Sequence, residues 1–204
     1  MNELTIESLN TIVPDIDFSF ILTPGWKGSL KDLLKVTTLA NSVKAEIAFG
    51  TLPDRLNRIF AIWCAEEALK QINFTSTQID SLIEKAKSFA NGDNLAIEIE
   101  VYWGHLRQSL SIDSQAVLST LSAAFNTKEK PSTIAAQASD SLWKSYRDSN
   151  QMNGSMSHQI QKIKSLIEEQ PHNQQSIDHQ CQAVNVGFTS RTLACRICGK
   201  SMTD

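Results

Sequence analysis

The sequence of 204 residues lacks several features that assign a protein to a functional class directly. It has no run of about 18 or more consecutive apolar residues, so we expect no membrane-spanning helix. Its first residues, MNELTIESLNTIVPDID, lack a basic segment followed by an apolar one. We therefore expect no secretory signal and a cytoplasmic protein. Positive charge is also scarce, because 19 Lys+Arg stand against 22 Asp+Glu, and coating of nucleic acid through net charge is not expected.

The motifs of several common enzyme classes are absent as well. The sequence contains no Gly-x-Ser-x-Gly elbow, no P-loop and no Rossmann glycine pattern. A zinc deaminase would need a His-x-Glu and a proline before its Cys-x-x-Cys, and neither stands near Cys195. We therefore expect a non-enzymatic protein.

What the sequence does contain is helical periodicity. Hydrophobic residues make up 41% and charged residues 20%, which favours a folded chain. Apolar side chains recur at helical spacing and predict an all-α bundle of about six helices over residues 29–148. An irregular arm, 1–28, precedes this helical domain. A connector with a short helix, 149–175, and a Cys/His tail, 176–204, follow it.

Three parts of this prediction depend on particular residues. The segment 52–73 reads as a central helix, because proline and aspartate begin it and an apolar stripe follows, Leu56, Ile59, Phe60, Trp63 and Leu69. Residues 97–101 alternate in polarity and also fit a strand, but their context favours a helix. In the arm we expect four apolar side chains to pack on the core, Phe18, Phe20, Leu22 and Trp26.

The tail carries three of the four cysteines, and two of them form a Cys-x-x-Cys-Gly-Lys motif that starts at Cys195. Two thiolates at this spacing in a tight turn can bind one tetrahedral ion, and the glycine lets the chain turn back. The nearest upstream donors are His179 and Cys181, so the predicted structural zinc site is His179, Cys181, Cys195 and Cys198. Three alternatives stay open: free thiols, a redox disulfide between Cys195 and Cys198, and a zinc ion shared between two chains.

Other candidate groups have a functional and a structural interpretation. Glu66 and Glu67 follow Trp63 on the central helix, while Glu98, Tyr102 and His105 are spaced to share a face of a later helix. Together the glutamates and His105 would serve an enzyme or a cofactor-binding bundle, but we favour a solvated or ion-paired face. Cys64 lies in an apolar helix without a neighbour that would lower its pKa, so we expect a core cysteine.

The partner is less constrained by sequence. Before residue 151 the chain has 14 Lys+Arg and 18 Asp+Glu, which is compatible with an acidic surface for a basic partner. The basic residues Arg191, Arg196 and Lys200 would let the tail contact nucleic acid, an alternative that we do not favour. A homo-oligomer is compatible with the sequence.

Residues 55–69, RLNRIFAIWCAEEAL, resemble an Arg-Leu-Phe-Ala-x-Trp-Cys-Ala type of helix in a group of bacterial all-helical immunity proteins. Residues 86–92, AKSFANG, are similar to the end of a second helix in that group, and the Ala-rich segment 134–146 has a counterpart there. The resemblance covers about residues 55–148 and assigns no catalytic residues. It implies a helical protein that binds a toxin or a component of a bacterial defence system. The leading hypothesis is therefore an interaction protein that covers a partner's surface with a helical face.

Overall fold

The computed structural model describes residues 3–148 and 155–169, together with the backbone of three short strands beyond them. The chain divides into two compact units, Met1–Glu169 and Gln170–Asp204. In the first unit the described helices are α1 (Ile6–Ile12), η1 (Phe18–Phe20), α2 (Leu30–Leu33), α3 (Asn41–Thr51), α4 (Asp54–Gln71), α5 (Thr77–Ala90), α6 (Ala96–Ser109), α7 (Gln115–Ala124), α8 (Pro131–Asp148) and α9 (Ser155–Glu168).

Short strands complete the described structure. In the first unit β1 (Leu4–Thr5) pairs antiparallel with β2 (Lys27–Gly28). In the second unit β3 (Ala183–Asn185), β4 (Leu193–Cys195) and β5 (Ser201–Met202) form an antiparallel sheet in that order. The chain is thus mainly helical, as predicted.

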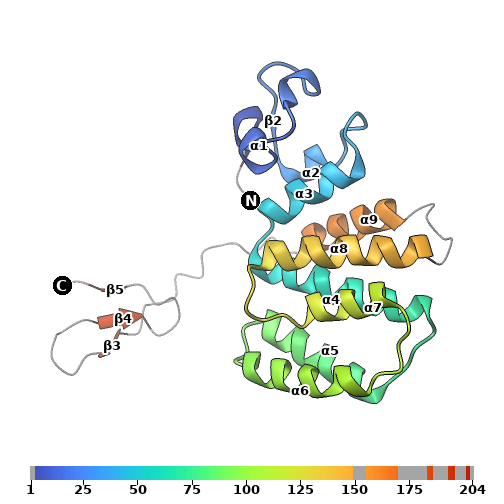
Figure 1. Ribbon diagram of the computed structural model, residues 1–204. Helices are drawn as coiled ribbons and strands as arrows, with labels where there is room; N and C mark the ends of the chain where they lie inside the picture. Colours follow the sequence, from blue (N-terminus) through green and yellow to red (C-terminus); the bar gives the residue numbers. More distant parts are fainter. Residues whose placement is uncertain (1–2, 149–154, 170–182, 186–192, 196–200, 203–204) are drawn as a thin grey trace. The chain divides into compact units, whose positions relative to one another are not determined.

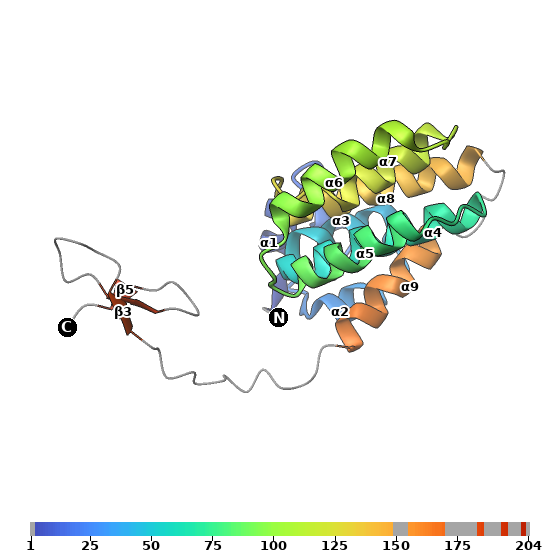
Figure 2. The ribbon, with the colours of Figure 1, turned by 90° about the horizontal axis from the view of Figure 1, so that it is seen from below.

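The first unit is built around α4, α7 and α8, which pack against one another (Figure 1). Helices α3 and α9 cover one side of this centre, and the segment from β1 to α2 lies beyond α3. On the other side α5 packs on α4, and α6 packs on α5 at the end of the unit, as the view from below shows (Figure 2). One apolar core extends through the unit.

Helix α4 is the central helix that the sequence predicts. Its Phe60 is fully buried, and the ring centroid lies 5.0 Å from that of Phe49 and 5.6 Å from that of Trp63. At its beginning the buried Asn57 side chain donates hydrogen bonds to the carbonyls of Phe49 and Leu52, at 3.1 and 3.2 Å. The corner between α3 and α4 is therefore fixed by polar contacts inside the core.

The N-terminal arm is more regular than predicted. Residues 6–12 form α1, which begins with a capping box between Thr5 and Ser8. Phe18 and Leu22 are buried as expected, but the prediction for Phe20 is wrong, because this side chain is 87% exposed. The short turn of η1 directs Phe18 inward and its near neighbour Phe20 outward.

The apolar stripe from Leu30 onward does not form the single helix that its spacing suggests. Ser29 is the N-cap of α2 and forms a capping box with Asp32. The helix then stops at Leu33, and α3 starts only at Asn41. The β-branched run Val36, Thr37 and Thr38 lies in this break, where such residues disfavour helix continuation.

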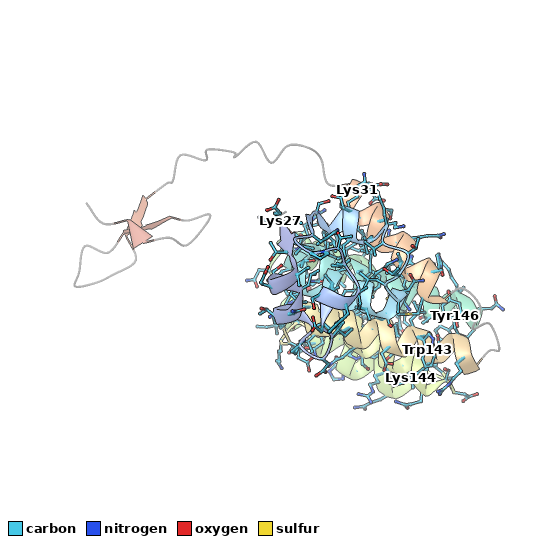
Figure 3. All side chains as sticks on the ribbon, turned by 90° about the horizontal axis from the view of Figure 1, so that it is seen from above. Lys27, Lys31, Trp143, Lys144 and Tyr146 are labelled. Atoms are coloured by element: carbon cyan, nitrogen blue, oxygen red, sulfur yellow. The ribbon has the colours of Figure 1, made fainter. Side chains whose placement is uncertain are left out.

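Helix α9 belongs to the helical unit rather than to a connector. Its apolar stripe is buried against the core, Ile160, Ile163, Leu166 and Ile167. We had expected little contribution to a core from this polar-flanked segment. At its end Glu168 forms an ion pair with Lys31, 3.2 Å apart, and Lys31 lies beside the end of α9 (Figure 3).

Two helical glycines offer a matched stability test. A Cβ atom added at Gly50 would lie 2.8 Å from Cγ2 of Ile12, whereas one added at Gly104 would meet nothing within 4 Å. Alanine favours a helix by about 1 kcal/mol over glycine, so Gly104→Ala should raise the free energy of unfolding by up to that amount. Gly50→Ala should lower it by about 1 kcal/mol or more, because α1 must shift away from α3. Urea denaturation of both variants checks this, and equal effects would contradict the α1–α3 contact.

Candidate functional site

The most distinctive surface feature is a groove between α3 and α8, closed at one end by α9. It encloses about 640 Å³, and its described lining residues are Asn41, Ser42, Ala45, Glu46, Phe49, Ala136, Ser139, Asp140, Trp143 and Met156. The small side chains of Ala45 and Ala136 leave room between the two helices. We call this feature the α3–α8 groove.

Aromatic and acidic side chains give the groove its chemistry. Trp143 is half-buried, and it lies with Lys144 near the C-terminal end of α8 (Figure 3). The Arg147 guanidinium carbon is 5.6 Å from the centroid of the Trp143 ring, which holds the indole by a cation–π contact. Glu46 is exposed on the α3 side, and Asp140 on the α8 side forms an ion pair with Lys144 at 2.6 Å. The groove thus combines an apolar floor with an acidic rim.

Buried polar contacts fix the position of α9 at the end of the groove. The Ser139 hydroxyl donates to Oε1 of Gln159, and Nε2 of Gln159 donates back to the Ser139 carbonyl at 3.2 Å. Gln159 is fully buried. Asn41 on α3 also donates to the Ser157 hydroxyl on α9, at 3.2 Å. These contacts hold α9 against α8 and α3, and the groove is present in the chain without a bound partner.

A second cluster lies where α4, α8 and α9 meet. The Glu67 side chain is 14% exposed, accepts a hydrogen bond from Nζ of Lys70 at 2.6 Å and lies 4.0 Å from Nδ1 of His158. The His158 ring meets Trp63 edge-on, with centroids 5.1 Å apart. The hydrogen bond to Glu67 raises the pKa of Lys70, and burial raises the pKa of Tyr146. These contacts join α9 to α4 and have a structural role.

His158 is the member of this cluster that the sequence analysis missed. It was assigned to a polar connector, because the preceding residues are rich in Asn, Ser, Met and Gln. The signal that could have found it is the apolar stripe of α9, which begins two residues later at Ile160. Extending that helix backward by one turn places His158 next to the core.

The residues proposed for the enzyme alternative are not brought together. Glu66 pairs with Lys87 at 2.9 Å, and Glu98 pairs with Lys85 at 2.6 Å. Helix α5 lies between the helices that carry these glutamates (Figure 1), and His105 is exposed on α6. The structure therefore places these acids on separate ion-paired surfaces.

Cys64 lies in the core, as predicted. It is fully buried, and this burial, with the Glu67 charge as a smaller cause, raises the pKa of its thiol well above the ordinary value. A thiol in this state is a poor nucleophile.

The predicted zinc ligands lie outside the residues whose side chains the structure describes. His179, Cys181 and Cys198 are not described, and of Cys195 only the backbone is, as the last residue of β4 opposite Ala183. Among the described residues no three His, Cys, Asp or Glu side chains gather to hold a metal ion. No helix in the described part of the chain is both long and apolar enough to cross a membrane.

Comparisons with known proteins add no assignment. The chain matches no protein-family model, no curated protein and no solved structure.

Proposed function

We propose that this protein is a non-enzymatic interaction protein that binds a partner protein through the α3–α8 groove. The observation that carries the proposal is a preformed concave surface with Trp143 in its wall. Binding energy at protein interfaces concentrates in few residues, and tryptophan is enriched among them. An apolar side chain that enters such a groove is removed from water on several sides, which is favourable by about 25 cal/mol per Å² of apolar surface.

The rim indicates the kind of partner segment. The described lining residues include two acids: Glu46 is exposed, whereas Asp140 pairs with Lys144, and Arg147 lies against the Trp143 ring. A partner helix with a large apolar residue and a neighbouring Lys or Arg would complement both the floor and the rim. The net charge of -3 would also attract a basic partner at longer range.

The biological role follows from the resemblance of residues 55–148 to bacterial immunity proteins. A toxin, or a component of a defence system, is the partner that this resemblance supports. The tail, with a structural zinc ion at His179, Cys181, Cys195 and Cys198, would be an accessory to this role in a reducing cytoplasm. The helical unit would provide the binding surface.

The test uses the product of the gene next to this one in its genome. Co-expression with this protein should remove the toxicity of that product, and the two should bind in calorimetry with purified components. Trp143→Glu should weaken binding by about 30-fold or more, the effect of losing a central interface residue. Glu46→Lys should weaken it less, because a rim charge acts mainly on the association rate.

Matched controls separate the groove from other surfaces. Phe20 is the most exposed of the large apolar side chains that the structure describes, and it lies on η1. The substitution Phe20→Ala should therefore leave binding unchanged. His105→Ala should also retain activity if the protein is a binder and not an enzyme. Undiminished protection by Trp143→Glu, or its loss in His105→Ala, would contradict the proposal.

A further inference from the structure

Helix α6 presents an apolar face to solvent. Its inner face buries Ile99, Trp103 and Leu106. The helix packs on α5, and the Trp103 ring also contacts Phe125 at the end of α7, with centroids 5.1 Å apart. On the opposite face Ile97 is 79% exposed and Val101 is 55% exposed. These two residues are four apart, and Gly104 and Gln108 continue the same face at helical spacing. The α6 outer face, which we define as residues 97, 101, 104 and 108, therefore has an apolar half and a half without bulky apolar groups.

Gly104 makes a notch next to the projecting Val101. A Cβ atom there would meet nothing within 4 Å, and the residue borders a hollow of about 760 Å³ between α6 and α7. Glycine inside a helix costs about 1 kcal/mol relative to alanine. A close approach of another backbone or side chain to this point would explain why the space is kept open.

The charges on α6 are divided between its two halves. Glu98 and Glu100 lie in the first half, and His105 and Arg107 lie in the second. Both acids already have partners. Glu98 pairs with Lys85 at 2.6 Å and is 58% exposed, whereas Glu100 pairs with Lys128 at 2.7 Å, accepts a hydrogen bond from the Thr127 hydroxyl and is 27% exposed. A second helix that runs antiparallel would place a basic half opposite each acidic half, whereas a parallel one would place like charges together.

One occupant fits both the shape and the charges, namely a second copy of the same helix. Two identical antiparallel helices are related by a two-fold axis. An arrangement in which Val101 packs on the partner's Gly104 therefore also packs the partner's Val101 on Gly104. Glu100 and the partner's Arg107 then lie on the same flank, about 3 Å apart along the axis. A surface that is complementary to itself in this way is typical of a two-fold dimer.

We propose that two copies of this chain associate through antiparallel contact of their α6 outer faces. Helix α6 has 14 residues. It is therefore about 21 Å long, and a pair of such helices buries less than the ~800 Å² per partner of a standard interface. We therefore expect a weak dimer. It uses a helix that does not line the α3–α8 groove, so it is independent of the function proposed above.

Analytical ultracentrifugation of the full chain from about 5 to 500 µM tests this dimer across the range where it should form. The wild-type protein should shift from monomer to dimer with concentration. Val101→Glu should remain monomeric, because a charge would be buried against the partner's Gly104. Gly104→Leu should weaken the dimer at least tenfold by filling the notch.

A charge reversal tests the orientation. Glu100→Arg and Arg107→Glu should each weaken association. The double variant should associate more tightly than Glu100→Arg alone. These two variants are comparable because both lack the ion pair between Glu100 and Lys128. Circular dichroism verifies that each variant is folded, and Phe20→Ala is the matched control that should dimerise normally. A wild-type chain that stays monomeric at the highest concentration, or a Val101→Glu variant that still dimerises, would overturn the proposal. Recovery that fails in the folded double variant would overturn the antiparallel arrangement.

Discussion

Replacing Phe60 with alanine is expected to lower the free energy of unfolding by about 3–5 kcal/mol. The Phe60 side chain is fully buried on α4, the helix that packs against α7, α8 and α5. Truncation removes its contacts with Phe49 and Trp63 and leaves a cavity that the surrounding helices fill only in part. Since a domain is stable by about 5–15 kcal/mol in total, this change is a large fraction of the whole.

Urea and thermal denaturation followed by circular dichroism measure this effect. The melting temperature should fall by roughly 10 °C or more. Phe20→Ala removes the same atoms from a side chain that is 87% exposed, and it should change stability by less than about 0.5 kcal/mol. Similar effects of the two substitutions would mean that α4 is not the centre of the core.

Loss of one tail cysteine is expected to abolish zinc binding. Purified wild-type protein should contain about one zinc ion per chain, and Cys195→Ser and Cys198→Ser should each contain less than about 0.2, because structural zinc requires four ligands. Metal analysis by mass spectrometry gives these values. A wild-type content below about 0.2 would rule out the zinc site, and a content near one half would favour an ion shared between two chains.

Two further measurements show whether the effect is specific. His172→Ala removes a histidine outside the predicted ligand set and should retain zinc. The melting temperature of the helical unit should stay unchanged in Cys198→Ser, since residues 3–148 and 155–169 have an apolar core of their own. A helical unit that unfolds upon loss of zinc would contradict this independence.

The sequence predicted the helices that have strong periodicity. Helix α4 was found because apolar residues recur along it at helical spacing, and Leu56, Phe60 and Leu69 are all buried. The segment 97–101 was correctly assigned to a helix even though its alternation also fits a strand. The burial of Cys64 followed from its apolar neighbours alone.

The predictions that failed depend on geometry that local composition does not report. Phe18 and Phe20 have the same local character, and only the turn of η1 decides that the first is buried and the second exposed. Helix α9 looked too polar at its ends to join a core, but Gln159 finds its partner on α8 at Ser139. A polar residue becomes a core residue when a distant helix satisfies its hydrogen bonds, and no local pattern reports this.

The sequence by itself determined that this protein is helical and that its cysteines divide into a buried one and a cluster in the tail, because periodicity and spacing are local properties. The tertiary structure decided which surfaces are available for binding. The α3–α8 groove forms because residues of α3 and α8 that are far apart in the chain, including Ala45 and Ala136, line the same hollow with Trp143. The α6 outer face is exposed because α6 is the last helix of its stack, with α5 on one side and solvent on the other.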